Sequence, residues 1–468
     1  MKKDLTAGSP LKLIIYFTIP LLIGNLFQQL YNTADTMIVG RTIGFNALAA
    51  VGVTGALVFF VIGFAQGLTG GFSIITAQKF GNKDDAGVRK SVASSFILSF
   101  IINIVLTLLS VILAGWLLHI IKTPDELYDN AYKYIVIIFW GTGAAILFNL
   151  FSNMLRAIGN SKWPLYFLII ACIVNIVLDY LFILSFNMGV AGAAFATVIS
   201  QITASLLCFE YIRRYVPELQ AKGSDWKVTK QDLWEHIRVG IPMAVQVAII
   251  AIGIVILQWA LNKLGALAVG AFTVAQRIDV LAVQCLLSFG ITMATYTAQN
   301  YGAGDIPRIR QGVRQGSIVS VAFAVISGIL ILLAADFSVR LFLGKNITDP
   351  AQIEETIRLA KVYLTINCSM YVFLALLLVF RSTLQGLGNS IVPTFAGVME
   401  LIMRTVAAII LSAYIGFAGI SWASPIAWVG AFIPVFAAYF YIIKRLMCKY
   451  EIKKARQKHA EKLREAAL

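Results

Sequence analysis

A single carboxylate interrupts the first apolar stretch of the chain. Asp35 lies in the segment FQQLYNTADTMIVG, and the surrounding apolar run extends from about Leu13 to Val39, which is long enough to cross a bilayer. A charged side chain at the centre of a membrane helix costs at least ~2.5 kcal/mol. Ionisable residues inside membranes usually mark proton or ion pathways, so the sequence predicts a functional carboxylate here.

Polar residues of two later segments are possible partners of Asp35. The segment LIIACIVNIVLDYLFIL carries Asn175 and Asp179 four residues apart, and therefore on one helix face. The next segment carries Thr197 in AAFATVIS. Carboxylate, amide and hydroxyl oxygens suit a hard cation, and two neighbouring carboxylates can share one proton. We predict that these four residues form a site for Na⁺ or H⁺; hydrogen bonding that only joins helices is the alternative.

The second half of the chain carries charged residues of its own in apolar segments. Glu400 and Arg404 are four residues apart, so they can neutralise each other on one helix face. Arg277 and Asp279 are two residues apart and face different ways, so at least one needs another partner. We assign these four residues to structural charge pairing. A role in substrate passage or in closing two lobes is the alternative.

Composition predicts a polytopic membrane protein. The 468 residues are 59% hydrophobic and only 13% charged, with a mean hydropathy of +0.82 and repeated apolar runs of membrane-spanning length. The net charge of +15 is concentrated at helix ends and in the C-terminal tail, which favours a topology signal over nucleic-acid binding. The five cysteines are dispersed and predict no disulfide framework.

The motifs of nucleotide-driven and catalytic proteins are missing from the sequence. There is no GxxxxGK[ST] motif and no HExxH motif, and no nucleophile and base stand in a recognisable pattern. We therefore predict that the chain is not an enzyme and needs no cofactor. Transport against a gradient would then require coupling to H⁺ or Na⁺.

Hydropathy and charge together predict the topology. Twelve apolar segments are expected, and the segments assigned to the side of the N-terminus carry 28 Lys and Arg against eight on the opposite side. This asymmetry predicts that both termini lie in the cytoplasm of a multi-pass plasma (inner) membrane protein. The expected division is an N-terminal segment at 1–12, a first lobe at 13–215, a linker at 216–232, a second lobe at 233–447 and a basic tail at 448–468.

The two halves of the chain repeat each other. TAQKFGNKD at 76–84 returns as TAQNYGAGD at 297–305, and LRAIGNSKWP at 155–164 returns as LQGLGNSIVP at 384–393. Six helices per half give both halves the same orientation, which predicts two pseudo-symmetric six-helix lobes with a cleft between them. At the same offsets, Asp35 and Asp179 correspond to Leu257 and Ala408, and Asn175 corresponds to Arg404. The acids are therefore expected in the first lobe only.

These duplicated motifs resemble those of the multidrug and toxic compound extrusion family over about residues 10–445. The resemblance implies an all-α integral membrane fold with two V-shaped lobes, and a first-lobe cation site at Asp35, Asn175, Asp179 and Thr197. It places Tyr31 beside that site, Gln28 on the wall of the lobe cavity and Pro20 at a bend of the first helix. The second-lobe acids of another family branch are absent here, with Gln246, Gln258 and Asn367 as the comparable polar residues.

The resemblance implies export of amphipathic, often cationic compounds in exchange for Na⁺ or H⁺ by alternating access. The expected partners are such small molecules and the lipid bilayer, and we expect a monomer that binds no nucleic acid. The alternative function is a flippase of a lipid-linked sugar or cell-envelope precursor, for which a more cationic cavity is expected. A membrane enzyme or receptor is a third alternative.

Overall fold

The protein is a bundle of long helices. The computed structural model describes residues 4–342 and 350–466, and within these ranges it contains no β-strand. Lys2, Lys3 and Lys345, which enter the charge count above, lie outside the described residues. The α-helices are α1 (Pro10–Thr42), α2 (Phe45–Gly81), α3 (Asp85–Ile120), α4 (Asp125–Trp140), α5 (Thr142–Ala157), α6 (Lys162–Tyr180), α7 (Gly189–Tyr215), α8 (Lys230–Asn262), α9 (Ala266–Gly302), α10 (Ile306–Leu333), α11 (Ala335–Phe342), α12 (Pro350–Ser369), α13 (Tyr371–Gly386) and α14 (Ile391–Ala466).

Most of these helices can cross a membrane. Within the described residues, nine helices are long and apolar enough to do so, or up to eleven if each bent pair counts as one span. The bent pairs are α4 with α5 and α12 with α13, at 45° and 46°. Gly141 separates α4 from α5. Helix α14 is also interrupted, because Ile415 and Gly416 have non-helical backbone angles.

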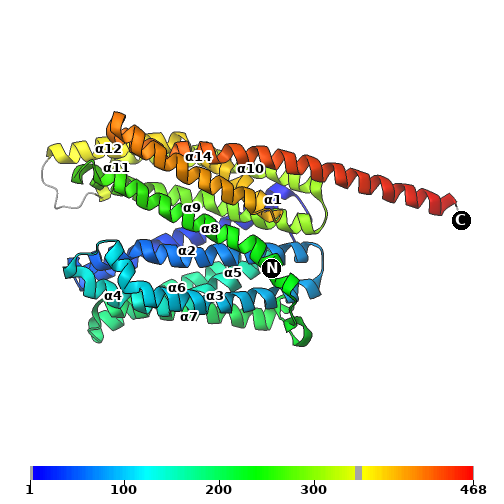
Figure 1. The fold of residues 1–468 in the computed structure, drawn as a ribbon, viewed down its shortest axis with the longest axis horizontal. Helices are drawn as coiled ribbons and strands as arrows, with labels where there is room; N and C mark the ends of the chain where they lie inside the picture. The colour runs from blue at the N-terminus through cyan, green and yellow to red at the C-terminus, as the bar shows by residue number, and fades with distance from the viewer. Residues whose placement is uncertain (1–3, 343–349, 467–468) are drawn as a thin grey trace.

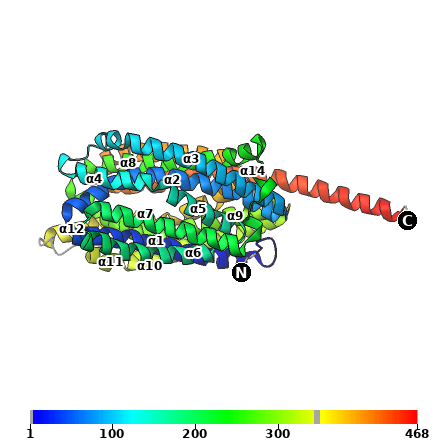
Figure 2. The same ribbon diagram turned by 90° about the horizontal axis from the view of Figure 1, so that it is seen from below.

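The helices of the two sequence halves lie side by side. Figure 1 shows α2 to α7 grouped on one side of the bundle and α8 to α14 on the other. Helix α1 packs against α6 of the first half and against α9 of the second. The C-terminal part of α14 extends well beyond the bundle in both views (Figures 1 and 2). We call residues 4–215 the first half and residues 230–466 the second half.

The repeated TAQ motifs end equivalent helices in the same way. After α2, the Asp84 carboxylate accepts a hydrogen bond from the Gly87 N–H at 2.8 Å and begins α3. After α9, the Asp305 carboxylate accepts one from the Arg308 N–H at 3.0 Å and begins α10. An aspartate at the N-cap satisfies an N–H that has no partner within the helix. The motif therefore encodes a tight helix-to-helix connection in both halves.

The same motifs join the two halves to each other. Gln78 donates to the Gly386 carbonyl at 2.8 Å, and Gln299 donates to the Ala157 carbonyl at 2.7 Å, so each TAQ glutamine reaches the other half. A methyl group on Gly81 would lie 1.9 Å from the Gln299 carbonyl oxygen. We call this exchange of hydrogen bonds the reciprocal glutamine contact.

The hydrogen bonds between the halves occupy one end of the bundle. In the described parts of the chain they run from Leu5 with Gln299, through Thr18 with Thr292, to the middle of α1 at Asn25 with Gln284 and Ser288. Ser91 of α3 with His236 of α8 belongs to the same end. The halves are therefore closed against each other at the end where α1 begins.

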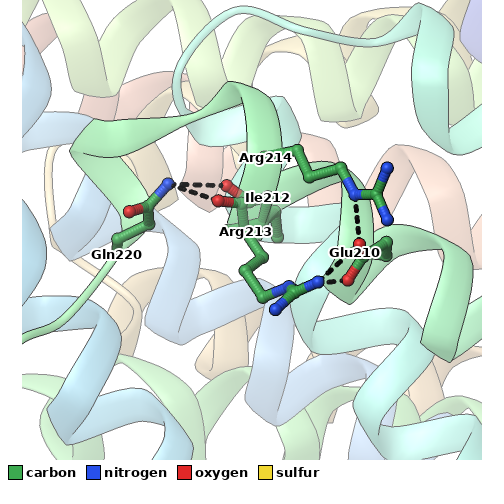
Figure 3. A network of polar contacts seen from close by, with 5 residues as sticks. All are labelled: Glu210, Ile212, Arg213, Arg214 and Gln220. Atoms are coloured by element: carbon green, nitrogen blue, oxygen red, sulfur yellow. Dashed lines mark hydrogen bonds and ion pairs between the residues drawn. The ribbon is translucent and has the colours of Figure 1, made fainter.

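A polar network fixes the exit of the chain from α7 (Figure 3). Gln220 donates from its side-chain amide to the carbonyls of Ile212 at 3.1 Å and Arg213 at 2.9 Å, near the end of the helix. The Glu210 carboxylate accepts from Arg213 at 2.7 and 2.8 Å and also from Arg214. Helix C-termini leave carbonyls without intrahelical partners, so Gln220 acts as a side-chain cap that turns the chain into the linker.

Candidate functional site

The predicted cation-site residues come from three packed helices of the first half. Tyr31 and Asp35 lie on α1, Asn175 and Asp179 on α6, and Thr197 on α7. Helix α6 packs against both α1 and α7, which brings the three helices to one place. Asn175 and Asp179 are fully buried and Asp35 is 8% exposed. The structure thus gathers residues separated by more than 150 positions in the sequence.

The side chains in this cluster contact one another. With its amide oriented to satisfy both neighbours, Asn175 donates to Asp179 Oδ2 at 3.2 Å and accepts from the Thr197 backbone N–H at 3.3 Å. The carboxyl groups of Asp35 and Asp179 lie within hydrogen-bonding reach of each other. Two carboxyl groups at this separation bind a shared proton as one unit. We call these residues, with Tyr31, the acid cluster.

Four oxygens of the acid cluster make no hydrogen bond of regular geometry, although Tyr31 Oη lies near Thr197 and Ser200. They are Tyr31 Oη, Asp35 Oδ1, Asp179 Oδ1 and Thr197 Oγ1, all buried. Buried polar atoms are normally paired, so four unpaired oxygens from four side chains mark a place that can accept a proton or an oxygen-coordinated cation. Among the residues that the structure describes, no group of three or more His, Cys, Asp or Glu side chains could hold a metal ion.

A turn of π-helix directly follows Asp179. Helix α6 ends at Tyr180, and Leu181–Ser185 forms the π-helix. Such turns are rare, and they occur frequently at functional sites because they displace the hydrogen-bond pattern of the helix by one residue. No residue pattern in LDYLFILS signals this turn, so sequence reasoning missed it.

Two further residues of the first half lie outside the acid cluster. Gln28 donates along α1 to Asn32 at 3.5 Å. Pro20 is buried inside α1, which continues as one helix from Pro10 to Thr42. A cavity-lining role for Gln28 and a bend at Pro20 stay predictions.

In the second half, Glu400 has two arginine partners. Glu400 Oε1 lies 2.7 Å from Arg404 Nη2, the i,i+4 partner, and Glu400 Oε2 lies 2.7 Å from Arg381 Nη2 on α13. All three side chains are less than one-tenth exposed. The packing of α13 on α14 places Arg381 inside the bundle. We call Arg381, Glu400 and Arg404 the charge triad.

Arg277 and Asp279 are not paired with each other. Asp279 is buried and accepts from Tyr371 Oη at 2.5 Å and from Tyr363 Oη at 3.4 Å. Arg277 lies on an exposed part of α9. The different orientations follow from the two-residue spacing, and the tyrosine partners were not foreseen because they depend on how α12 and α13 pack on α9.

The positions equivalent to the acids are apolar. Leu257 and Ala408 are both buried and belong to one hydrophobic cluster of the second half. The two equivalent positions therefore lie together within each half, but they are acidic only in the first half.

A polytopic helical membrane protein with duplicated halves and a buried pair of acids has the features of a secondary transporter. The chain matches the MatE family over residues 20–181 and 242–410. It therefore belongs to this family of multidrug and toxic compound extrusion proteins, which are transporters and not enzymes.

Similar proteins cover almost the whole chain. The Bacillus subtilis protein named "Probable multidrug resistance protein YoeA" is 26% identical over 92% of this chain and 93% of its own. "Multidrug export protein MepA" of Staphylococcus haemolyticus is 24% identical over 92% and 94%. The solved structure described as "Crystal structure of MATE in complex with MaL6" is 24% identical, with a TM-score of 0.88 over 95% of this chain and 98% of that chain. The similarity to this solved structure supports the fold described above.

Proposed function

We propose that the chain forms twelve membrane spans in two six-helix lobes arranged as a V, with both termini in the cytoplasm. The kink at Ile415 and Gly416 supports a division of α14 into two spans, and each bent pair supplies one more. The excess of Lys and Arg on the side of the N-terminus supports the orientation. The closed end of the bundle is then the cytoplasmic end.

We further propose that the protein is an antiporter that exports amphipathic, cationic compounds in exchange for H⁺ or Na⁺. The acid cluster carries this proposal, because it presents two carboxyl groups and four unpaired buried oxygens without a neighbouring basic side chain among the described residues. A structural role would favour fully paired groups. The names of the relatives, which describe multidrug resistance and export, support the class of substrate.

Coupling requires that the two lobe arrangements bind the ion with different affinity. An ion that binds both states equally shifts no equilibrium. Asp35 lies on α1, which also contacts the second half through Thr18 and Asn25. Neutralisation of the acid cluster can therefore act on the same helix that joins the lobes.

A flippase of a lipid-linked anionic precursor is the second candidate. It is favoured by the charge triad, in which two arginines face one glutamate and leave an excess positive charge in the second half. The acid cluster is not required for this activity.

Purified protein in liposomes separates the two candidates. A cationic fluorescent drug inside the vesicles should leave when an H⁺ or Na⁺ gradient is imposed, and only one of the two ions should be required. Drug movement that does not depend on either gradient would contradict the antiporter. If a fluorescent lipid-linked diphosphate sugar is also transferred without a gradient, the result would support the flippase.

A further inference from the structure

A basic cavity lies beside the second LxxxGNS turn. It has a volume of about 360 Å³ and is bounded by the start of α14 at Asn389 and Ser390, by Arg238 of α8 and by Arg445 and Lys449 of α14. No carboxylate is among its lining residues. The cavity therefore concentrates three positive charges around a helix N-terminus, which itself favours anions.

The cations that line the cavity have no acidic partner. Within the described residues, Arg238, Arg445 and Lys449 form no ion pair, whereas Lys90 of α3 lies 2.7 Å from Asp232 of α8. Ser390 is only 2% exposed, and its hydroxyl has no hydrogen-bond partner although it lies at the cavity wall. An unpaired buried hydroxyl and three free cations are the groups that bind phosphate oxygens.

The equivalent turn of the first half is filled. The space beside Gly159, Asn160 and Ser161 has a volume of only about 10 Å³, because Leu5 and residues of early α1 cover it. Lys162 at this turn lies over the Tyr16 ring, 4.8 Å from its centroid. Nothing in the duplicated motif requires an open cavity, so the open basic cavity distinguishes the second turn from its first-half equivalent.

We propose that this cavity binds a phosphate group, either that of an anionic phospholipid headgroup or that of a soluble phosphate ester. The cavity lies at the closed end of the bundle. The basic tail of α14 continues beyond this end (Figure 2). Basic pockets between membrane helices at this level bind lipid headgroups. The inference is independent of the coupling ion and of the exported substrate.

The full-length protein in neutral detergent tests the proposal. Its thermal unfolding, followed by tryptophan fluorescence, is measured with added phosphatidylglycerol, with phosphatidylcholine, or with inorganic phosphate. Phosphatidylglycerol should raise the unfolding midpoint more than phosphatidylcholine. Arg445→Ala/Lys449→Ala should raise the half-saturating lipid concentration about thirtyfold, since each cation near a phosphate accounts for about fivefold. Arg238→Gln, on a different helix, should raise it about fivefold.

Lys453→Ala/Lys454→Ala is the matched control, because it removes the same charge from the same helix outside the cavity. It should leave the response to phosphatidylglycerol near that of the wild type. An equal midpoint shift with inorganic phosphate would support the proposal with a soluble ester as the source. Equal weakening by both double variants, or no difference between the two lipids and no response to phosphate, would overturn it.

Discussion

The two halves of this protein share a backbone plan but differ in the charges that they bury. In the first half, Asp35 and Asp179 lie together without a basic partner among the described residues. In the second half, the equivalent positions are the apolar Leu257 and Ala408. The buried Glu400 is paired with two arginines in the triad, and the buried Asp279 accepts hydrogen bonds from two tyrosine hydroxyls. A charge with a fixed partner stabilises one structure, whereas a pair of acids without one can change its state of protonation or cation binding. The difference assigns stability to the triad and switching to the acid cluster.

The duplication also preserved one contact between the two halves. The reciprocal glutamine contact uses equivalent positions of the same motifs in both directions, with Gly386 and Ala157 as the acceptors. Because both halves contribute equally, this contact has the symmetry expected of two rigid bodies that meet at one end. The halves thus share their contact surface and differ in their charged interiors.

The largest effect on folding is expected from the charge triad. Glu400→Gln leaves Arg381 and Arg404 without an opposite charge inside the bundle, which should cost about 3–5 kcal/mol. Arg404→Met should be milder, because Arg381 and Glu400 remain as a neutral pair. The unfolding midpoint in detergent measures both.

Removal of both i,i+4 partners tests the three-residue arrangement. Glu400→Gln/Arg404→Met leaves Arg381 unpaired, so it should be nearly as unstable as Glu400→Gln alone. Full recovery in this double variant would show that Arg381 is not part of the unit. Glu355→Gln, in an exposed pair with Arg358, is the control and should leave the unfolding midpoint near that of the wild type.

Substitutions at the contact surface between the halves should destabilise the protein nearly as much as those at the charge triad. Gly81→Ala and Gly302→Ala each place a methyl group 1.9 Å from a backbone oxygen of the other half. Overpacking of this kind typically costs about 1–3 kcal/mol, and here it acts on the closed end only. We expect both variants to expose this end, measured as faster alkylation of a cysteine introduced at Thr18. Gly52→Ala on α2, with nothing within 4 Å of the added atom, should not change that rate.

The smallest effect on stability is expected at the end of α7, outside the charge triad and the contact surface between the halves. Gln220→Ala removes two hydrogen bonds to the last turn of α7 (Figure 3). Hydrogen bonds at an exposed helix end are replaced by water, so the loss should be about 0.5–1.5 kcal/mol. Drug export should stay at the wild-type rate. A loss of export would mean that the linker takes part in the movement of the halves.

Sequence reasoning reached the features that depend on local spacing. The four-residue spacing placed Asn175 and Asp179 on one face of α6, and the same spacing paired Glu400 with Arg404. The duplicated TAQ motifs matched two segments that the structure places directly before α3 and α10. In each case the relevant partner is either a few residues away or repeated in the sequence.

Features that depend on packing between distant helices were not predicted. Arg381 joins Glu400 only because α13 packs on α14, and Tyr371 reaches Asp279 only because α13 also packs on α9. The filling of one duplicated turn by Leu5, and not of the other, depends on the course of the N-terminal segment. The charge pattern of a single segment contains no information on these contacts.

The central claim is that Asp35 switches its state during transport, and one measurement tests it directly. Asp35→Asn keeps the side-chain volume but holds the position permanently neutral, so it should fold and insert normally. In inside-out vesicles with an imposed H⁺ or Na⁺ gradient, it should bind drug but fail to accumulate it. Asp179→Asn should behave alike, and the double variant should be little worse, because the two acids act as one unit. If Asp35→Asn at wild-type abundance accumulates drug at the wild-type rate, the carboxylate is structural and the account is wrong.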